Sequence, residues 1–132
     1  MRLEQISVFV ENTQGILADI TTGLGNAGVN IQAFAVFDTP EFGILRMIVD
    51  KPEEALEQLK QENYVASKQT ILGANLQNVP GNLGKVLTAL HEAGLTIEYL
   101  YTIMFTDDGH PMLLFSTDDN EAAAKVLKEL QA

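Results

Sequence analysis

The sequence contains one pattern twice, and this internal repeat constrains the fold more than any other feature. Glycine and apolar positions recur at a spacing of 66 residues: Gly15, Leu17, Leu24, Ala27, Gly28 and Ile31 return as Gly81, Leu83, Leu90, Ala93, Gly94 and Ile97. Later in each copy the spacing grows to 68, where Glu53 and Leu59 match Glu121 and Leu127. Because loops tolerate insertions, the second copy is expected to carry about two extra residues in a connection.

Hydrophobic periodicity predicts the same order of elements in both copies. In the first copy, alternation through Ile6, Val8 and Val10 predicts a strand, and helical spacing of Leu17 and Leu24 predicts a helix. The remaining elements follow as a strand over 30–37, a turn over 38–43, a strand over 44–49, a helix from Pro52 and a strand over 65–72.

The second copy is predicted to repeat this order without its last strand. Its elements are a strand over 73–79, a helix over 83–93, a strand over 96–106, a turn over 107–109, a strand over 111–117 and a helix over 120–130. An open sheet edge is expected there. It would be covered by another chain or by a neighbouring segment, unless the sequence stops short of the natural chain.

These elements predict an α+β protein of two βαββαβ modules, residues 1–72 and 73–132, with the second module lacking its final strand. No linker rich in Pro, Gly or Ser separates the modules. Each is near the lower size limit for independent folding, so we expect them to pack together.

Composition excludes several classes of function. The net charge is −10, and the eight basic residues are spread along the chain, which argues against a nucleic-acid partner. No run of about 18 apolar residues could span a bilayer, no export signal is visible at the N-terminus, and the sequence contains no cysteine. We expect a cytoplasmic protein with no membrane partner.

Two segments carry a resemblance to a known family. Residues 10–17 (VENTQGIL) and 77–83 (QNVPGNL) each lead into a helix that ends Ala-Gly-Val-Asn-Ile or Ala-Gly-Leu-Thr-Ile. This paired pattern resembles the ACT domain family over the whole chain, as two copies of about 66 residues. The resemblance implies ferredoxin-like modules, pairing of modules, and binding of a free amino acid where two modules meet.

The resemblance also implies which residues would hold the ligand. They are Asn12, Gly15, Ile16 and Leu17 in the first loop, Asn78, Gly81, Asn82 and Leu83 in the second, and Asn30 at the start of the second strand. Ligand would lie between the first loop of one module and the second strand of the other. Thr96 stands at the position of Asn30 in the second copy, so the two pockets are expected to be inequivalent.

The chemistry of these positions agrees with such a ligand. A glycine before a helix lets a ligand approach the backbone, and the free N–H groups of the first helical turn favour a carboxylate. An asparagine side-chain carbonyl can accept a hydrogen bond from an ammonium group. The same residues have plainer interpretations, since Gly15 and Gly81 could only shape tight turns, Asn12 and Asn78 could only cap helices, and Asn30 could only begin a strand.

No pattern of catalytic, cofactor or metal-binding residues emerges. Residues 23–28 spell the G-x-G-x-x-G of dinucleotide sites, but they fall at a predicted helix end, where the motif has no function. His91 and His110 have no second ligand at metal-binding spacing. We expect no enzyme activity, no cofactor and no metal.

The sequence therefore predicts a regulatory protein that binds a small free amino acid and acts by allosteric regulation as a homodimer, with a metabolic enzyme as a possible target. The alternative is an interaction or regulatory subunit of a metabolic enzyme that works without a ligand.

Overall fold

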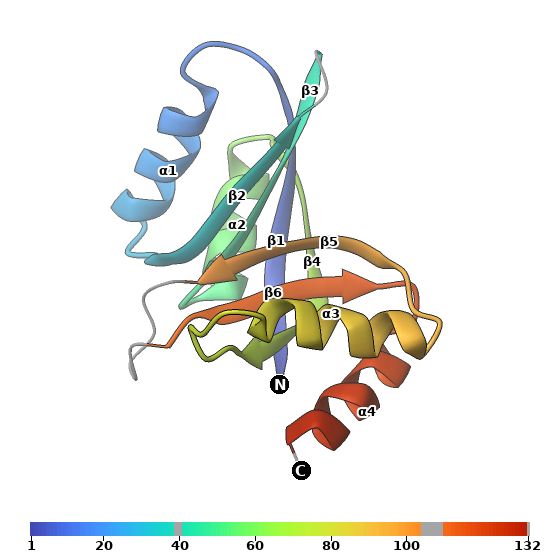
Figure 1. Cartoon of the computed structure of the whole chain (residues 1–132). Helices are drawn as coiled ribbons and strands as arrows, with labels where there is room; N and C mark the ends of the chain where they lie inside the picture. The colour runs from blue at the N-terminus through green and yellow to red at the C-terminus, as the bar shows by residue number, and fades with distance from the viewer. Residues whose placement is uncertain (39–40, 104–109, 132) are drawn as a thin grey trace. The chain divides into compact units, whose positions relative to one another are not determined.

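Ten helices and strands make up the described part of the chain, residues 1–38, 41–103 and 110–131 of a computed structural model (Figure 1). In chain order they are β1 (Arg2–Glu11), α1 (Ile16–Asn26), β2 (Ile31–Asp38), β3 (Phe42–Val49), α2 (Pro52–Gln61), β4 (Val65–Asn75), α3 (Asn82–Glu92), β5 (Ile97–Ile103), β6 (Met112–Thr117) and α4 (Asn120–Gln131). The α+β class and the repeated order of elements are confirmed. The turn predicted over 107–109 lies outside the described residues.

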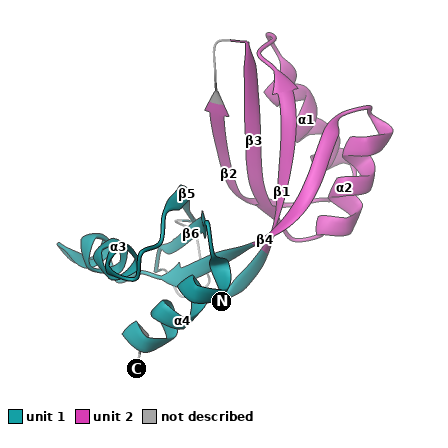
Figure 2. Ribbon diagram, turned by 90° about the vertical axis from the view of Figure 1, so that its right-hand side faces the viewer, with its two compact units in different colours: residues 1–3, 71–132 teal, residues 4–70 magenta. Residues whose placement is uncertain are grey.

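The strands hydrogen-bond in the order β2-β3-β1-β4-β6-β5, and the chain divides into two compact units (Figure 2). One unit comprises residues 4–70, and the other comprises residues 1–3 with 71–132. Strands β1 and β4 each contribute residues to both units.

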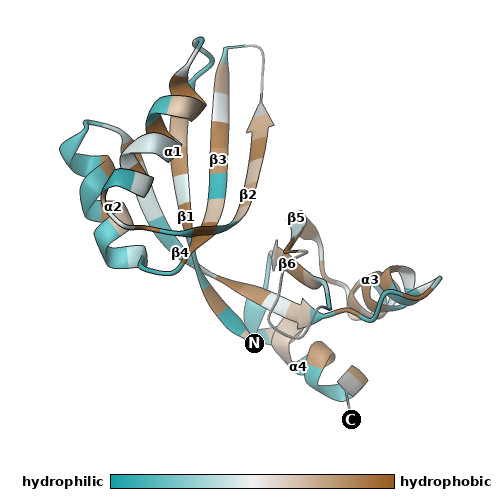
Figure 3. Cartoon of the chain, turned by 90° about the vertical axis from the view of Figure 1, so that its left-hand side faces the viewer, coloured by the Kyte–Doolittle hydropathy of each residue, from teal (hydrophilic) through white to brown (hydrophobic). Residues whose placement is uncertain are grey.

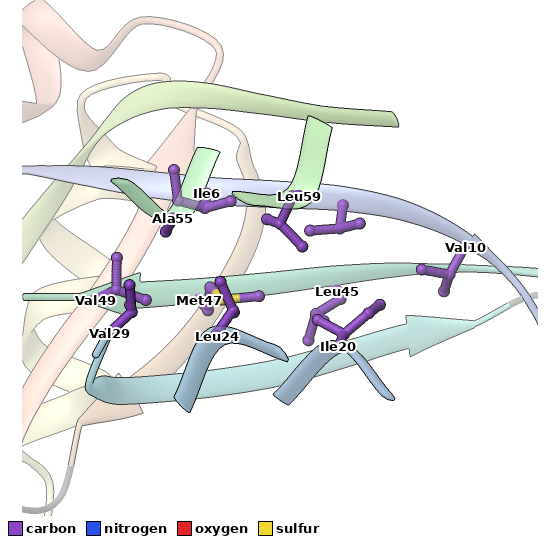
Figure 4. Packing of buried hydrophobic residues seen from close by; sticks show 11 residues of the cluster. Ile6, Val10, Ile20, Leu24, Val29, Leu45, Met47, Val49, Ala55 and Leu59 are labelled. Carbon is purple, nitrogen blue, oxygen red and sulfur yellow. The ribbon is translucent and has the colours of Figure 1, made fainter. Parts of the chain in front are cut away.

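The unit of residues 4–70 packs α1 and α2 against one face of its sheet. Val8 and Val36 both pair with Leu45 of β3, so these three side chains lie on the same face. Figure 4 shows the resulting core, in which Ile20 and Leu24 of α1 meet strand residues that include Leu45. Helix α2 is hydrophilic on its outer side (Figure 3), as expected for a helix that buries only one stripe.

The second unit repeats this packing with α3, α4, β4, β6 and β5. Residues 72–75 of β4 pair antiparallel with β6, and β6 pairs with β5. Phe115 is fully buried at the centre of a core that also takes Leu90 from α3 and Leu127 from α4.

The prediction of two separate strands over 65–72 and 73–79 is wrong. A single strand, β4, runs from Val65 to Asn75 and serves both units. Gly73, the first residue of the second predicted strand, lies within β4, and no proline occurs between Pro52 and Pro80. The strand continues because nothing in this segment removes a backbone donor or forces a turn.

The edge that the incomplete second copy was expected to leave open is covered at Gly73 by the first residues of the chain. Met1 and Gly73 exchange two main-chain hydrogen bonds, of 3.0 and 2.8 Å. Residues 1–3 thus supply, over a short length, the edge strand that the second copy lacks. Of the expected ways to cover this edge, the structure shows a segment of the same chain.

The glycines of residues 23–28 lie at the end of α1, as predicted, and Gly28 adopts a positive φ of 80°. A dinucleotide site needs such a motif at the start of a helix, so these residues serve to end one. Across the described residues, no helix is both long enough and apolar enough to cross a membrane.

Candidate ligand-binding loops

The loop between β1 and α1 turns on Gly15. This residue has φ 86° and ψ −5°, in the left-handed region that side chains with a Cβ avoid. A Cβ built there would meet nothing within 4 Å, so the backbone conformation alone requires glycine. The space beside Gly15 is open to a ligand.

The N–H groups of two residues at this loop, Leu17 and Ala18, have no acceptor among the described residues, although those of nearby Thr13 and Asp19 do. The Thr13 N–H donates to the Glu11 carbonyl at 2.8 Å, and the Asp19 N–H donates to the Gly15 carbonyl at 3.0 Å. No side chain caps α1, and among the described residues neither the Leu17 N–H nor the Ala18 N–H donates a hydrogen bond. The first turn of α1 therefore presents free donors at the positive end of its dipole.

A hollow of about 330 Å³ lies against this loop. It is lined by Val10, Asn12, Thr13, Gly15, Ile16, Leu17, Ala18 and Val36. Val10 is buried, whereas Asn12 and Thr13 are exposed at the rim. All four first-loop residues predicted from the sequence are brought together here, with an apolar floor and a polar rim, as in small-molecule sites.

The second loop has the same backbone geometry. Gly81 has φ 85° and ψ −7°. The Val79 N–H donates to the Gln77 carbonyl at 2.9 Å, and the Lys85 N–H donates to the Gly81 carbonyl at 3.0 Å, each 66 residues after its counterpart. The repeat thus extends to individual hydrogen bonds.

The side chains of the second loop are arranged differently. The Asn82 amide donates to the Gln77 carbonyl at 3.0 Å, and Asn82 lines a hollow that faces α4. Asn78, Gly81 and Leu83 are exposed. The two loops are therefore inequivalent in chemistry, although their backbones match.

Asn30 does not join the first loop within its own unit. It precedes β2 at the far end of α1 from Gly15, a helix length of about 16 Å at 1.5 Å per residue. Its N–H donates to the Asp50 carboxylate at 2.8 Å, and its carbonyl accepts from the Asp50 N–H at 3.1 Å. Thr96 makes the same pair of bonds with Asp118, at 3.0 and 3.1 Å.

Sequence reasoning missed four of the residues that line the first hollow, namely Val10, Thr13, Ala18 and Val36. Val10 and Thr13 lie within the motif of residues 10–17 and Ala18 follows it, so these three could have been found from the sequence. Val36 could not, because its place depends on the register of β2 against β3. Asp50 and Asp118 were also missed, although their shared position before the second helix of each copy was visible.

The titratable groups with shifted pKa values lie away from this hollow. Burial raises the pKa of Tyr64, and the nearby carboxylates of Asp19 and Glu62 raise it further. A hydrogen bond to Glu53 raises the pKa of Lys68, which also pairs with Glu4. Within the described ranges, no three His, Asp or Glu side chains are grouped so that they could hold a metal ion.

Comparison with known proteins gives one family match and several similar structures. The family model described as an ACT domain pair matches residues 1–131. A search of curated proteins found no significant match.

Two crystal structures illustrate the structural similarity. Protein BT0572 from Bacteroides thetaiotaomicron is 33% identical, with a TM-score of 0.90 over 99% of this chain and 90% of its own. The ligand-free regulatory subunit of aspartate kinase from Thermus thermophilus is 19% identical, with a TM-score of 0.67 over 96% of this chain and 91% of its own. The second likeness concerns the fold alone.

Proposed function

This chain belongs to the ACT domain family, as two ACT domains in one polypeptide, and we propose that it is a non-catalytic regulatory protein that binds a small free amino acid at its first strand-to-helix loop. The amino acid would bias an equilibrium between two conformations or assembly states. A cysteine-free chain suits the reducing cytoplasm, where we place this activity.

The observation that carries the proposal is the hollow beside Gly15. The free N–H groups of Leu17 and Ala18 provide donors for a carboxylate, with a helix-dipole contribution of about 0.3–1 kcal/mol at an exposed site. The side-chain carbonyl of Asn12 can accept from an ammonium group. Val10, Ile16 and Val36 form an apolar wall for the ligand's side chain.

The position of Asn30 supports a homodimer as the binding form. Asn30 and Gly15 lie at opposite ends of α1. Asn30 can therefore complete a site at the first loop only when it comes from a second molecule of the protein. Strand β2 is at the edge of the strand order, where a second molecule could pair with it. Its residues Phe34 and Val36 are 40% and 39% exposed.

A second candidate function is that of an interaction subunit of a metabolic enzyme, without a ligand. It is favoured by an aromatic patch on the sheet face away from α1 and α2, where Phe9 and Phe42 stack with ring centroids 5.2 Å apart and are 47% and 40% exposed. Exposed apolar patches of this kind mark protein partners. A similarly folded Thermus thermophilus protein is described as an enzyme's regulatory subunit.

Heat denaturation with each of the twenty amino acids separates the two functions. A ligand at 100 times its Kd stabilises a protein by about 2.7 kcal/mol, which raises the midpoint by roughly 8 °C for a chain of this size. We expect one amino acid, or a few related ones, to do so. If none does, and a partner enzyme is retained without amino acids but lost in Phe9→Glu, the interaction subunit is the better account.

A further inference from the structure

A second hollow, of about 270 Å³, lies between α3, α4 and the end of β4. It is lined by Ala74, Asn75, Gln77, Asn82, Lys85, Val86, Leu127 and Leu130. Ala74 and Leu127 are buried and form an apolar floor, while Lys85 is exposed at the rim. The amides of Asn75, Gln77 and Asn82 add polar groups around that rim.

The duplication shows what fills the corresponding place in the unit of residues 4–70. Lys85 and Leu130 correspond to Asp19 and Glu62, at spacings of 66 and 68. Tyr64 lies within electrostatic reach of both carboxylates and packs against the core cluster that holds Ile20 and Leu59. In that unit, therefore, a partly buried phenol ring packs on the core near these positions.

The second copy has no aromatic residue at the position that corresponds to Tyr64. At the same spacing of 68, the residue that corresponds to Tyr64 is Ala132, which carries a methyl group instead. The hollow therefore lies beside positions that flank a part-buried aromatic ring in the other unit.

The charge beside this space is also reversed. The carboxylate of Asp19 acts electrostatically on Tyr64, whereas at the corresponding position the cation Lys85 lines the hollow. The ion pairs among the described residues involve Arg2 and Lys68, and Lys85 takes part in none of them. Although the chain has a net charge of −10, Lys85 is a cation without an ion-pair partner in the described part of the chain, beside an apolar floor, and it favours an anionic ligand at this hollow.

We propose that the hollow between α3 and α4 binds a small carboxylic acid whose apolar body is about the size of a phenol ring. The apolar body of the ligand lies on the floor formed by Ala74 and Leu127, and its carboxylate faces Lys85. This site is separate from the first loop, and it does not depend on the proposed amino-acid binding.

The test is an NMR titration of the ¹⁵N-labelled full chain with 4-hydroxyphenylacetate. This probe has the ring and the carboxylate but no ammonium group, so it lacks half of what the first loop is proposed to recognise. We expect saturable shifts at the amides of Asn82, Lys85, Val86 and Leu127. The uncharged amide of the probe is expected to bind about tenfold more weakly, as for loss of one charge-assisted contact.

Two variants with the same change in net charge sharpen the result. Lys85→Glu should weaken binding of the probe by about tenfold or more, whereas Lys125→Glu, an α4 residue outside the hollow, should leave it unchanged. Lys85 is exposed, so both variants are expected to fold, and their amide spectra check this. Asn12→Ala, which removes the proposed amino-acid contact, should not alter the titration.

Three results would overturn the proposal. They are equal binding to Lys85→Glu and wild type, shifts confined to residues 10–18, and no saturable shift at millimolar probe. Loss of amino-acid binding in Asn12→Ala, together with an unchanged titration, would separate this site from the first loop.

Discussion

Met1 and Gly73 hydrogen-bond to each other in both directions: the amino group of Met1 donates to the Gly73 carbonyl at 3.0 Å, and the Gly73 N–H donates to the Met1 carbonyl at 2.8 Å. The chain's first residues therefore belong to the unit that is otherwise built from its second half. This pairing covers an edge of the kind that favours association between chains.

Gly73→Ala tests this pairing. A Cβ at residue 73 would lie 2.8 Å from Leu3 Cδ1 and 3.1 Å from Met112 Sδ. The neighbours must move, and we expect the free energy of unfolding to fall by about 1–2 kcal/mol, measured by urea denaturation. Because Leu3 makes the closest contact, Gly73→Ala should lower the free energy of unfolding by less in a Leu3→Ala background. An equal cost in both backgrounds would contradict the packing of residues 1–3 on Gly73.

Gly15→Ala and Gly81→Ala test the left-handed turns at the two loops. Both residues have φ near 85°, and neither has a neighbour within 4 Å of a built Cβ. The cost is therefore conformational, about 1–2 kcal/mol for each variant. Gly25→Ala is the matched control, because Gly25 lies inside α1 at an ordinary φ with open space around it, and it should stabilise the protein by about 0.5–1 kcal/mol. Thermal melts of the three variants give the comparison.

Asp50→Ala and Asp118→Ala should destabilise their own units by similar amounts. Each carboxylate accepts one main-chain N–H, from Asn30 and Thr96 at 2.8 and 3.0 Å. Since both acids are exposed, the expected loss is about 1 kcal/mol each. Amide hydrogen exchange at Asn30 and Thr96 measures the local effect, and faster exchange at the site of the changed acid alone would agree with two independent clamps. Unchanged exchange at both sites would show that the carboxylates contribute nothing.

Tyr64 should make the unit of residues 4–70 sensitive to alkaline pH. Burial and the carboxylates of Asp19 and Glu62 raise the pKa of Tyr64 in the folded protein above its value in the unfolded chain. The folded state thus holds this proton more tightly, and the resulting stability is complete below the unfolded pKa and is lost as pH rises through the folded one. Denaturation midpoints should fall above about pH 10 in the wild type. Tyr64→Phe should show less of this loss, and an identical pH profile would contradict the shift.

The repeat predicted most of the fold because each copy gives independent evidence for the same helices and strands. Val8 and Ala74, at the same position in each copy, are both buried in the core. Gly28 and Gly94 end α1 and α3 with φ of 80° and 79°, as left-handed caps must. Local pattern sufficed here because helix ends and alternating strands depend on nearby residues.

What the sequence could not reveal depends on long-range pairing. The pairing of residues 1–3 with β4 at Gly73 joins segments about 70 residues apart. The same holds for Val36 at the first hollow, whose position follows from the register of β2. Asn12, Gly15, Ile16 and Leu17 come together because they are consecutive in one turn, whereas Asn30 does not reach them within its unit.

Titration calorimetry with the amino acid that most raises the thermal midpoint tests the central claim most directly. We expect about one site per chain, and Asn12→Ala should weaken binding by roughly tenfold to a hundredfold, since a charge-assisted hydrogen bond contributes about 1.5–3 kcal/mol. The corresponding second-loop variant, Asn78→Ala, should leave the affinity nearly unchanged. Binding of the same strength in Asn12→Ala and wild type, or no heat of binding with any amino acid at millimolar concentration, would contradict an amino-acid site at the first loop.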